Sequence, residues 1–286
     1  MYAIREILHF CSEHLKKHFI RYPKRQAEEL MCYVLGMKRI DLYLNFERLL
    51  EEEELAFCRR AIKRRVSGEP LQYIRGVVDF YGCSIVVDSR VLIPRPETEV
   101  LVDKIAYSLS KEDLKGKILW DVCCGSGCIG ISLKKRFPDL KVMLSDLSAS
   151  ALETARENAK RNGVEASIVR GDLLEPFKGM KTHYLVSNPP YISREEYEKL
   201  DREVKGFEPE LALLGGETGF EFYKRLAKDL PSHLLPLGKA WLEIGYRQGE
   251  SIYKIFSHYP WKTRSFEKDW AGLDRFFFLE KEEFFM

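Results

Sequence analysis

The sequence has no apolar run long enough to cross a membrane and no strong excess of charge of either sign. A membrane-spanning helix needs about 20 predominantly apolar residues, and polar residues interrupt every apolar run of this 286-residue chain well before that length. The first ten residues mix charges and a histidine with apolar residues, unlike a secretory signal. We therefore expect an unprocessed cytoplasmic protein. A formal net charge of +2 gives no general argument for a nucleic-acid partner.

Paired cysteine spacing is also missing. The seven cysteines are an odd number and are scattered through the chain, which favours reduced thiols over a disulfide framework. Cys123, Cys124 and Cys128 lie close together, but no histidine or fourth cysteine completes a metal-binding set. Packing of small side chains explains this group better, and we expect no metal.

The chain does have enough apolar residues for one large globular domain and a smaller one, at 45% hydrophobic and 31% charged. Apolar residues at helical spacing predict helices over residues 2–19, 23–36 and 51–65, and a shorter segment at 40–46. The basic end of the third helix, Arg59 to Arg65, either complements the helix dipole or forms a contact surface for RNA or an acidic protein.

A change of period near residue 74 marks a second region. Alternating residues over 74–81 and 84–87 predict a β-hairpin around Gly82. A stiff segment with two prolines then precedes a helix that begins at Glu97 or Thr98. From residue 117 onward strands alternate with helices, which predicts βαβ units and a parallel sheet. The strands are expected at 118–123, 142–145, 167–170, 183–186 and 240–244, the helices at 129–137, 148–162, 220–230 and 251–257, and a closing antiparallel hairpin at 263–268 and 275–280.

A glycine-rich loop follows the first of these parallel strands. Residues 125–130 contain a G-x-G-x-x-G pattern, and Asp146 ends the next strand, as in dinucleotide-binding folds. Glycines let a backbone approach a ligand, and the acidic residue can accept hydrogen bonds from ribose hydroxyls. NAD and S-adenosylmethionine both carry a suitable adenosine. Asp121, Asp172 and the closing hairpin favour the methyl donor, so we predict a methyltransferase rather than a dehydrogenase.

The second motif is Asn188-Pro189-Pro190-Tyr191, directly after a strand. Proline cannot continue a strand ladder, and open α/β sheets bind ligands at the carboxyl ends of their strands. An amide or ring amine is a poor nucleophile because its lone pair is delocalised. The Asn188 oxygen and a carbonyl of the proline turn can accept its two N–H groups and aim the nitrogen at a methyl carbon, with Tyr191 stacked on its plane. A simple strand-to-turn stop is the alternative.

Several segments together resemble the bacterial PrmC/HemK family, whose members methylate the glutamine amide in the Gly-Gly-Gln motif of class-1 peptide chain release factors. The resemblance covers nearly the whole chain. It rests on Asn188 to Ile192 and on the segments 68–74 (GEPLQYI), 80–82 (FYG), 93–99 (IPRPETE), 207–209 (FEP) and 271–275 (AGLDR).

The resemblance implies a class I S-adenosylmethionine-dependent methyltransferase fold, an α/β fold with a Rossmann-like seven-stranded sheet. The expected domains are a helical bundle at 1–72 that recognises the release factor, a β-hairpin linker at 73–94 and a catalytic domain at 95–286. The implied cofactor-binding residues are Cys123, Cys124, Gly125, Ser126, Gly127, Asp146, Asp172, Leu173 and Asn188. The implied catalytic and substrate-binding residues are Asn188, Pro189, Pro190 and Tyr191, and Arg95 and Glu97 are added for substrate binding.

The family usually has glycine at the position of Cys123, which puts the tightness of cofactor binding in question. A monomer without a direct nucleic-acid substrate is expected. The main alternative is an adenine-amino methyltransferase acting on DNA or RNA, because the same four residues can hold an exocyclic amine. Such an enzyme should carry a separate basic recognition domain, and the chain has only the Arg59 to Arg65 cluster. A degenerate fold that serves as a scaffold is a third interpretation, which the intact motifs disfavour.

Overall fold

The computed structural model describes residues 2–283, so positions 1 and 284–286 of the expected domains lie outside the described residues. The chain divides into two compact units. Among the described residues, the first unit contains those up to Gly76 together with Asp201–Phe207, and the second contains Val77–Leu200 and those from Glu208 onward. The sequence pattern gave no sign that a segment from the second half of the chain belongs to the first unit.

The first unit is built from helices whose apolar stripes face one core. Its described helices are α1 (Ile4–Lys17), α2 (Pro23–Leu35), α3 (Arg39–Leu44), α4 (Glu52–Val66), α5 (Leu71–Arg75) and α10 (Arg202–Phe207). The expected helices near 2–19, 23–36 and 51–65 are confirmed. Pro23 opens α2, and Gly36 ends it in the left-handed conformation at φ 62°, as glycine commonly does after a helix.

Two basic residues at the end of α4, Arg64 and Arg65, make contacts inside this unit. Arg65 is buried and donates to Gln26 Oε1 at 2.6 Å, to the Glu69 carbonyl at 3.1 Å and to Glu203 Oε2 of α10 at 2.6 Å. Arg64 forms a bidentate ion pair with Glu69. The Arg59 to Arg65 cluster therefore offers fewer unpaired positive charges to RNA or an acidic protein than the sequence suggested.

The β-hairpin begins later than the alternating pattern predicted. Residues 74 and 75 close α5, and Gly76 ends that helix at φ 73°, so the strands are β1 (Val77–Phe80) and β2 (Cys83–Val86). Tyr81 and Gly82 both have positive φ, the geometry of a tight two-residue hairpin turn.

The second unit contains a sheet with the strand order β5-β4-β3-β6-β7-β9-β8. The first five strands in this order are parallel, and β9 runs antiparallel to both β7 and β8. The expected parallel sheet with a closing hairpin at its edge is confirmed. Within the described residues the strands are β3 (Ile118–Val122), β4 (Lys141–Asp146), β5 (Ser167–Arg170), β6 (Thr182–Ser187), β7 (Leu234–Glu243), β8 (Trp261–Lys268) and β9 (Asp274–Lys281).

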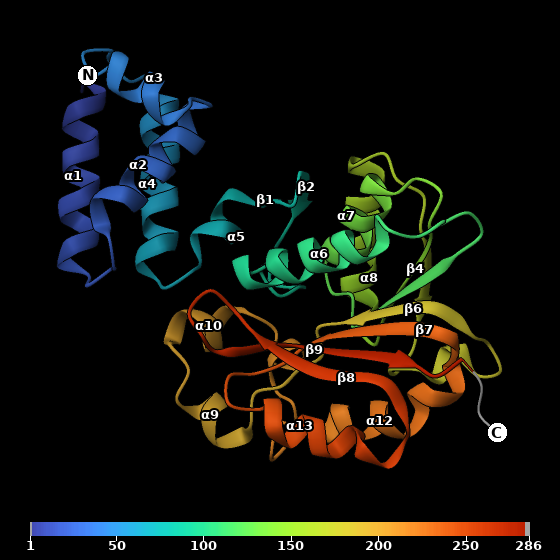
Figure 1. Cartoon of the computed structure of the whole chain (residues 1–286). Coiled ribbons are helices and arrows are strands. Elements are labelled where there is room, and N and C mark those ends of the chain that lie inside the picture. Colours follow the sequence, from blue (N-terminus) through green and yellow to red (C-terminus); the bar gives the residue numbers. More distant parts are fainter. Residues whose placement is uncertain (1, 284–286) are drawn as a thin grey trace. The chain divides into compact units, whose positions relative to one another are not determined.

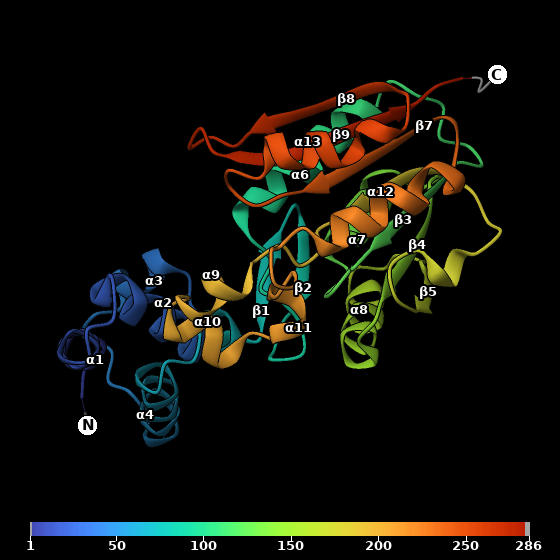
Figure 2. The ribbon, with the colours of Figure 1, turned by 90° about the horizontal axis from the view of Figure 1, so that it is seen from below.

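Helices cover both faces of this sheet. Figure 1 shows α6 (Pro96–Leu109) and α7 (Cys128–Arg136) on one side, and α12 (Glu221–His233) and α13 (Gly249–Ile255) on the other. In Figure 2, α13 lies over the hairpin of β8 and β9. Helix α8 (Ala149–Arg161) packs on β4 and β5. The side chains of Asn158 and of Asn162, the C-cap residue of α8, form hydrogen bonds with the backbone of β2. These bonds hold the hairpin against this helix.

The region between β6 and α12 has helices that the sequence pattern did not predict. They are α9 (Arg194–Glu198), α10 and α11 (Glu210–Leu213), and each is too short to show a helical period. Single 3₁₀ turns η1 (Glu175–Phe177) and η2 (Phe256–His258) complete the second unit. No helix among residues 2–283 combines the length and apolar character that a membrane crossing requires.

Candidate functional site

The candidate site lies where the strand order of the sheet reverses. The chain moves outward from β3 to β4 and β5, then returns to β6 on the other side of β3. Ligands of open α/β sheets bind at such a reversal, beyond the carboxyl ends of the strands. A pocket at this point receives residues from the ends of β3, β4, β5 and β6.

Most of the predicted site residues line this pocket. Those that do are Arg95, Cys123, Cys124, Gly125, Ser126, Asp146, Asp172, Leu173, Asn188 and Pro190. Glu97, Gly127, Pro189 and Tyr191 lie outside its lining in the described structure. The lining also includes residues that the sequence analysis did not single out, namely Arg90, Leu92, Pro94, Thr98, Leu211 and Phe222.

The glycine loop turns sharply between β3 and α7. Gly127 has φ 77° and is the N-cap residue of α7, and a Cβ at this position would lie 2.9 Å from Ile131 Cδ1. A Cβ at Gly130 would lie 2.4 Å from Leu144 Cδ2, so only glycine lets α7 pack this closely on β4. Cys123 also has a positive φ, 59°, which an L-residue adopts at a cost.

Asp146 combines a loop-shaping role with an open acceptor. Its Oδ2 accepts the Gly125 N–H and its Oδ1 accepts the Ser148 N–H, both at 2.9 Å. Burial raises the pKa of Asp146, and the backbone donors oppose that rise. A carboxylate oxygen accepts more than one hydrogen bond, so the fixed carboxylate can still bind hydroxyl groups in the pocket.

The other acidic residues of this region have separate partners. Asp121 lies within β3, is fully buried, and accepts the Gly130 N–H at 2.8 Å. Burial raises the pKa of Asp121 to about 7. Asp172 lines the pocket and pairs with Arg225 at 2.8 Å. Residues 2–283 contain no group of histidine, cysteine or acidic side chains arranged to hold a metal ion.

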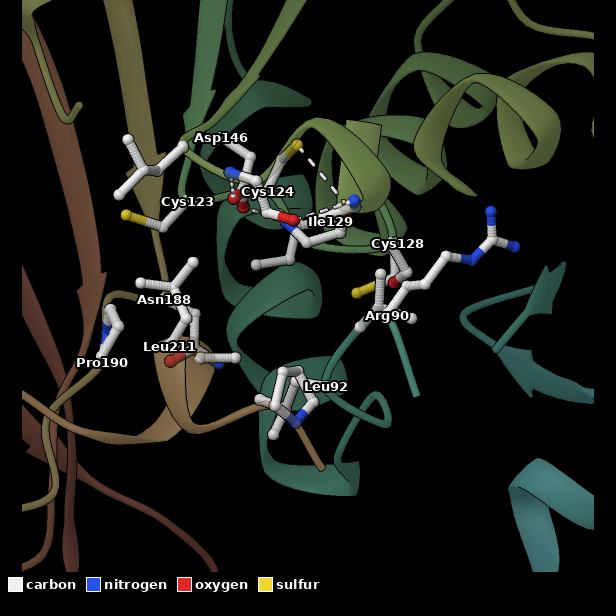
Figure 3. Close-up of a pocket in the computed structure, with 18 of the residues that line it drawn as sticks. Arg90, Leu92, Cys123, Cys124, Cys128, Ile129, Asp146, Asn188, Pro190 and Leu211 are labelled. Atoms are coloured by element: carbon white, nitrogen blue, oxygen red, sulfur yellow. Dashed lines mark hydrogen bonds between the residues drawn. The ribbon is translucent and has the colours of Figure 1, made fainter. Parts of the chain in front are cut away.

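Asn188 stands at the end of β6 with its amide available. Ser187, the last strand residue, donates from Oγ to the Val122 carbonyl at 2.7 Å and ties the end of β6 to β3. The Asn188 side chain has no hydrogen-bond partner among the described residues and lines the pocket. Figure 3 shows Asn188 and Pro190 on the side of the pocket opposite to Cys124 and Asp146.

Tyr191 turns away from the pocket into a buried polar cluster. Its hydroxyl lies 3.4 Å from Glu243 Oε1 and 3.5 Å from Arg275 Nη1. Its carbonyl accepts a hydrogen bond from Gln248 Nε2 at 3.0 Å. Burial raises the pKa of the Tyr191 hydroxyl. The residue is partly buried, and these contacts hold its ring in place on one side of the motif.

The proline-rich segment forms another wall of the pocket. Arg95 donates to Glu208 Oε1 at 2.5 Å, and the Ile93 N–H donates to the other carboxylate oxygen at 3.1 Å. Glu97 lies in the first turn of α6, beside the Thr98 that faces the pocket. The one sequence signal for Glu208 was its place in the Phe-Glu-Pro run. Thr98 gave no separate signal, because a threonine at a helix start is ordinary.

Comparisons with known proteins match both parts of the chain. A family model described as the PrmC N-terminal domain matches residues 6–76, and a methyltransferase small domain model matches residues 96–203. A methyltransferase structure from Pyrococcus furiosus covers 70% of this chain and 90% of its own, with a TM-score of 0.53 and 19% identity. This likeness concerns the fold alone. Together with the methyltransferase small domain match, it identifies the fold as that of class I S-adenosylmethionine-dependent methyltransferases.

Curated relatives extend the match to nearly the full length. The release factor glutamine methyltransferase of Chlamydia trachomatis serovar D is 40% identical over 279 residues, which is 98% of this chain and 94% of the relative. The protein of the same name from Geobacter sulfurreducens is 36% identical over 275 residues, 96% of this chain and 95% of the relative. The chain therefore belongs to the release factor glutamine methyltransferase family.

Proposed function

We propose that this protein transfers a methyl group from S-adenosylmethionine to the glutamine side-chain amide in the Gly-Gly-Gln motif of class-1 peptide chain release factors. The observation that carries the proposal is the free amide of Asn188, which lines the same pocket as the glycine loop and Asp146. Membership of the family over 98% of the chain, helical first unit included, supports a protein substrate.

The geometry suits a nitrogen that must be held rather than deprotonated. S-adenosylmethionine supplies an electrophilic methyl carbon when it is bound. The Asn188 oxygen accepts one N–H of the substrate amide, and a carbonyl of the two-proline turn accepts the other. Both acceptors stabilise the positive charge that develops on the nitrogen, an effect worth several kcal/mol at best. The proton can leave afterwards, because methyl transfer makes the nitrogen acidic.

The residues of the pocket fit the methyl donor. Residues 123–126 line one end of the pocket, and residues 123–127 are assigned to the methionine part of the donor. Asp146 keeps acceptor capacity for the ribose hydroxyls. Leu173 is 5% exposed and provides an apolar surface for adenine, with Asp172 beside it.

The first unit is assigned to recognition of the release factor. A groove there is lined by apolar residues of α1 and α4, and Phe10 is 57% exposed at it. Lys17, Arg59 and Lys63 stand around the same groove, where Glu13 is the acidic residue. This charge balance fits a release-factor segment that places an apolar side chain beside acidic ones.

We place the enzyme in the cytoplasm as a monomer. All seven cysteines, each within the described residues, are free thiols, which fits a reducing compartment. Light scattering of the purified protein checks the monomer, since a dimer would double the measured mass.

The decisive experiment incubates the protein with a purified release factor and isotope-labelled S-adenosylmethionine, followed by mass spectrometry of the peptides. Label on the Gly-Gly-Gln peptide is expected. Asn188→Ala should retain donor binding and lose transfer by about 100-fold or more, whereas Asn45→Ala, an exposed residue of the first unit, should transfer normally. Label on nucleic acid alone would favour the adenine-amino alternative instead.

The groove is tested separately on the full chain. Phe10→Ser should weaken release-factor binding by about tenfold, the loss of one well-packed aromatic contact, and leave donor affinity unchanged. Phe19→Ser is the matched control, because Phe19 is 94% exposed in the same unit and lies outside the groove. Equal binding by the two variants would place the recognition surface elsewhere.

A further inference from the structure

A carboxylate beneath the Asn188 motif has no role in the chemistry described so far. Glu243 ends β7, and its neighbour Leu242 is paired with Ser187 at the end of β6. The Glu243 side chain is buried, with the residue 1% exposed. A buried carboxylate is costly unless hydrogen bonds and charges compensate it, so its surroundings need an explanation.

Groups from three other segments converge on this carboxylate. Thr98 of α6 donates from Oγ1 to Glu243 Oε2 at 2.6 Å, and the Tyr191 hydroxyl lies 3.4 Å from Oε1. Arg275 of β9 supplies positive charge, and Glu97 supplies the opposing negative charge. The Tyr223 hydroxyl of α12 fixes the backbone by donating to the Glu243 carbonyl at 2.8 Å. The carboxylate therefore joins α6, the Asn188 motif and β7.

Two of these contacts lead directly to the reacting site. Thr98 lines the pocket from the side of the proline-rich segment. Tyr191 is the last residue of the Asn188 motif, and the prolines before it have fixed φ angles. Because the chain between Asn188 and Tyr191 is stiff, the position of the Tyr191 ring controls the direction of the Asn188 amide and of the proline carbonyls.

The backbone around Tyr191 is held as closely as its ring. Gln248 donates to the Tyr191 carbonyl, and a Cβ at Gly219 would lie 2.4 Å from that oxygen. The Ile192 N–H donates to the Leu213 carbonyl at 3.1 Å. The ring hydroxyl is then the remaining point of attachment, where Glu243 accepts its hydrogen bond and Arg275 lies on its other side.

We propose that Glu243 is a positioning residue. By holding the Tyr191 and Thr98 side chains in fixed positions, it aims the Asn188 amide at the substrate nitrogen. The proposal rests on the proposed function for its kinetic consequence. Glu243 touches neither substrate nor donor, since it lies outside the pocket lining of the described structure. Its loss should therefore lower kcat and leave KM and donor affinity nearly unchanged, because misalignment of bound groups slows transfer without weakening binding.

The test compares Glu243→Gln with Tyr191→Phe and with the double variant. Each single change should lower kcat for release-factor methylation by about 10- to 100-fold, with KM for release factor and the Kd of S-adenosylmethionine changed by less than threefold. The double variant should lose no more than the worse single variant, because the two side chains act as one unit. Losses that multiply, or an unchanged kcat in Glu243→Gln, would overturn the proposal.

Glu112→Gln is the matched control. Glu112 is a partly buried carboxylate of the same unit, bonded to the Tyr184 hydroxyl and to Lys239 Nζ, and it lies outside the pocket lining. The same change of charge there should leave kcat as in the wild type. A comparable fall in kcat would show that loss of any such carboxylate disturbs the domain.

A second measurement does not depend on activity. The Ile192 N–H donates to the Leu213 carbonyl, and the Gly215 N–H donates to the Ile192 carbonyl. Hydrogen exchange of these two amides should be about tenfold faster in Glu243→Gln than in the wild type, while the amides of β3 exchange as before. Unchanged exchange in this segment would overturn the positioning role. Faster exchange in a protein that methylates no release factor would instead retain the positioning role and contradict the proposed function.

Discussion

The carboxylate of Glu208 accepts a hydrogen bond from the guanidinium of Arg95 at 2.5 Å, and its second oxygen accepts the Ile93 N–H at 3.1 Å. Only 1% of the Glu208 side chain is exposed. Pro94 lies between the two donors and Pro209 follows the acceptor, and both prolines line the pocket. One buried carboxylate thus joins two walls of the candidate cofactor site.

Glu208→Gln should weaken binding of S-adenosylmethionine by about tenfold. The substituted amide still accepts the Ile93 N–H, but it loses the charge-assisted bond to Arg95, which is among the stronger hydrogen bonds in proteins. Isothermal titration measures the change. Glu210→Gln is the control, because Glu210 pairs with Arg194 where both side chains are about half exposed, and such pairs contribute little. Equal losses in the two variants would contradict the role of Glu208.

Cys123→Gly should strengthen donor binding several-fold at little cost in stability. Cys123 has φ 59° and lines the pocket. Glycine at this position relieves a backbone strain of about 1 kcal/mol, which offsets the lost contacts of the small thiol. It also removes a side chain beside the cofactor, which favours donor binding. Titration of S-adenosylmethionine and urea unfolding measure the two effects.

Leu173→Gly is the comparison for Cys123→Gly. Leu173 has φ 50°, lines the same pocket and is 5% exposed. It should lose at least about 2 kcal/mol of unfolding free energy, because a large buried side chain is removed. Weaker donor binding by Cys123→Gly than by the wild type would show that the thiol itself contributes to the pocket.

Much of the fold and of the central site could be predicted because those features are local. Alternating strands and helices place residues at the carboxyl ends of parallel strands on one edge of the sheet. The glycine loop, Asp146 and Asn188 each lie at the carboxyl end of a predicted strand. The topology of the sheet therefore brings them together at one edge. Helix boundaries at Pro23 and Gly36 likewise depend on neighbouring residues alone.

The remaining features depend on contacts between distant parts of the chain. The bond of Glu208 to Arg95 and that of Glu243 to Thr98 each join segments more than 100 residues apart, and no periodicity reports such pairs. The direction of Tyr191 is set by Glu243 and Arg275, on strands that the sequence pattern could not place beside it. Helix α10 is too short to predict and gains its place through Arg65.

Asp121→Asn should flatten the dependence of stability on pH. Burial raises the pKa of Asp121 from 3.8 to about 7 in the folded protein. The folded state therefore holds a proton that the unfolded state has released, so wild-type stability falls as pH rises from about 4 through 7. Asparagine does not titrate. Urea unfolding at pH 5 and pH 8 should show that the variant gains stability relative to the wild type at the higher pH, and parallel curves would contradict the assignment.

Arg65→Met should destabilise the first unit and release α10 from it. Arg65 is 3% exposed and bonds to Gln26, to the Glu69 carbonyl and to Glu203 of α10. Methionine keeps an apolar stem of similar reach but leaves these acceptors without their donor, which should cost about 2–4 kcal/mol of unfolding free energy.

Urea unfolding and hydrogen exchange of residues 201–207 measure the effect of Arg65→Met. Arg60→Met is the control, because Arg60 is exposed and its guanidinium lies over the Phe57 ring, 5.5 Å from the centroid. Loss of this exposed contact should change stability by less than about 1 kcal/mol. If both variants unfold alike and residues 201–207 stay protected in each, α10 is held to the first unit by packing, such as that of Phe207 against Gly68, rather than by the buried cation.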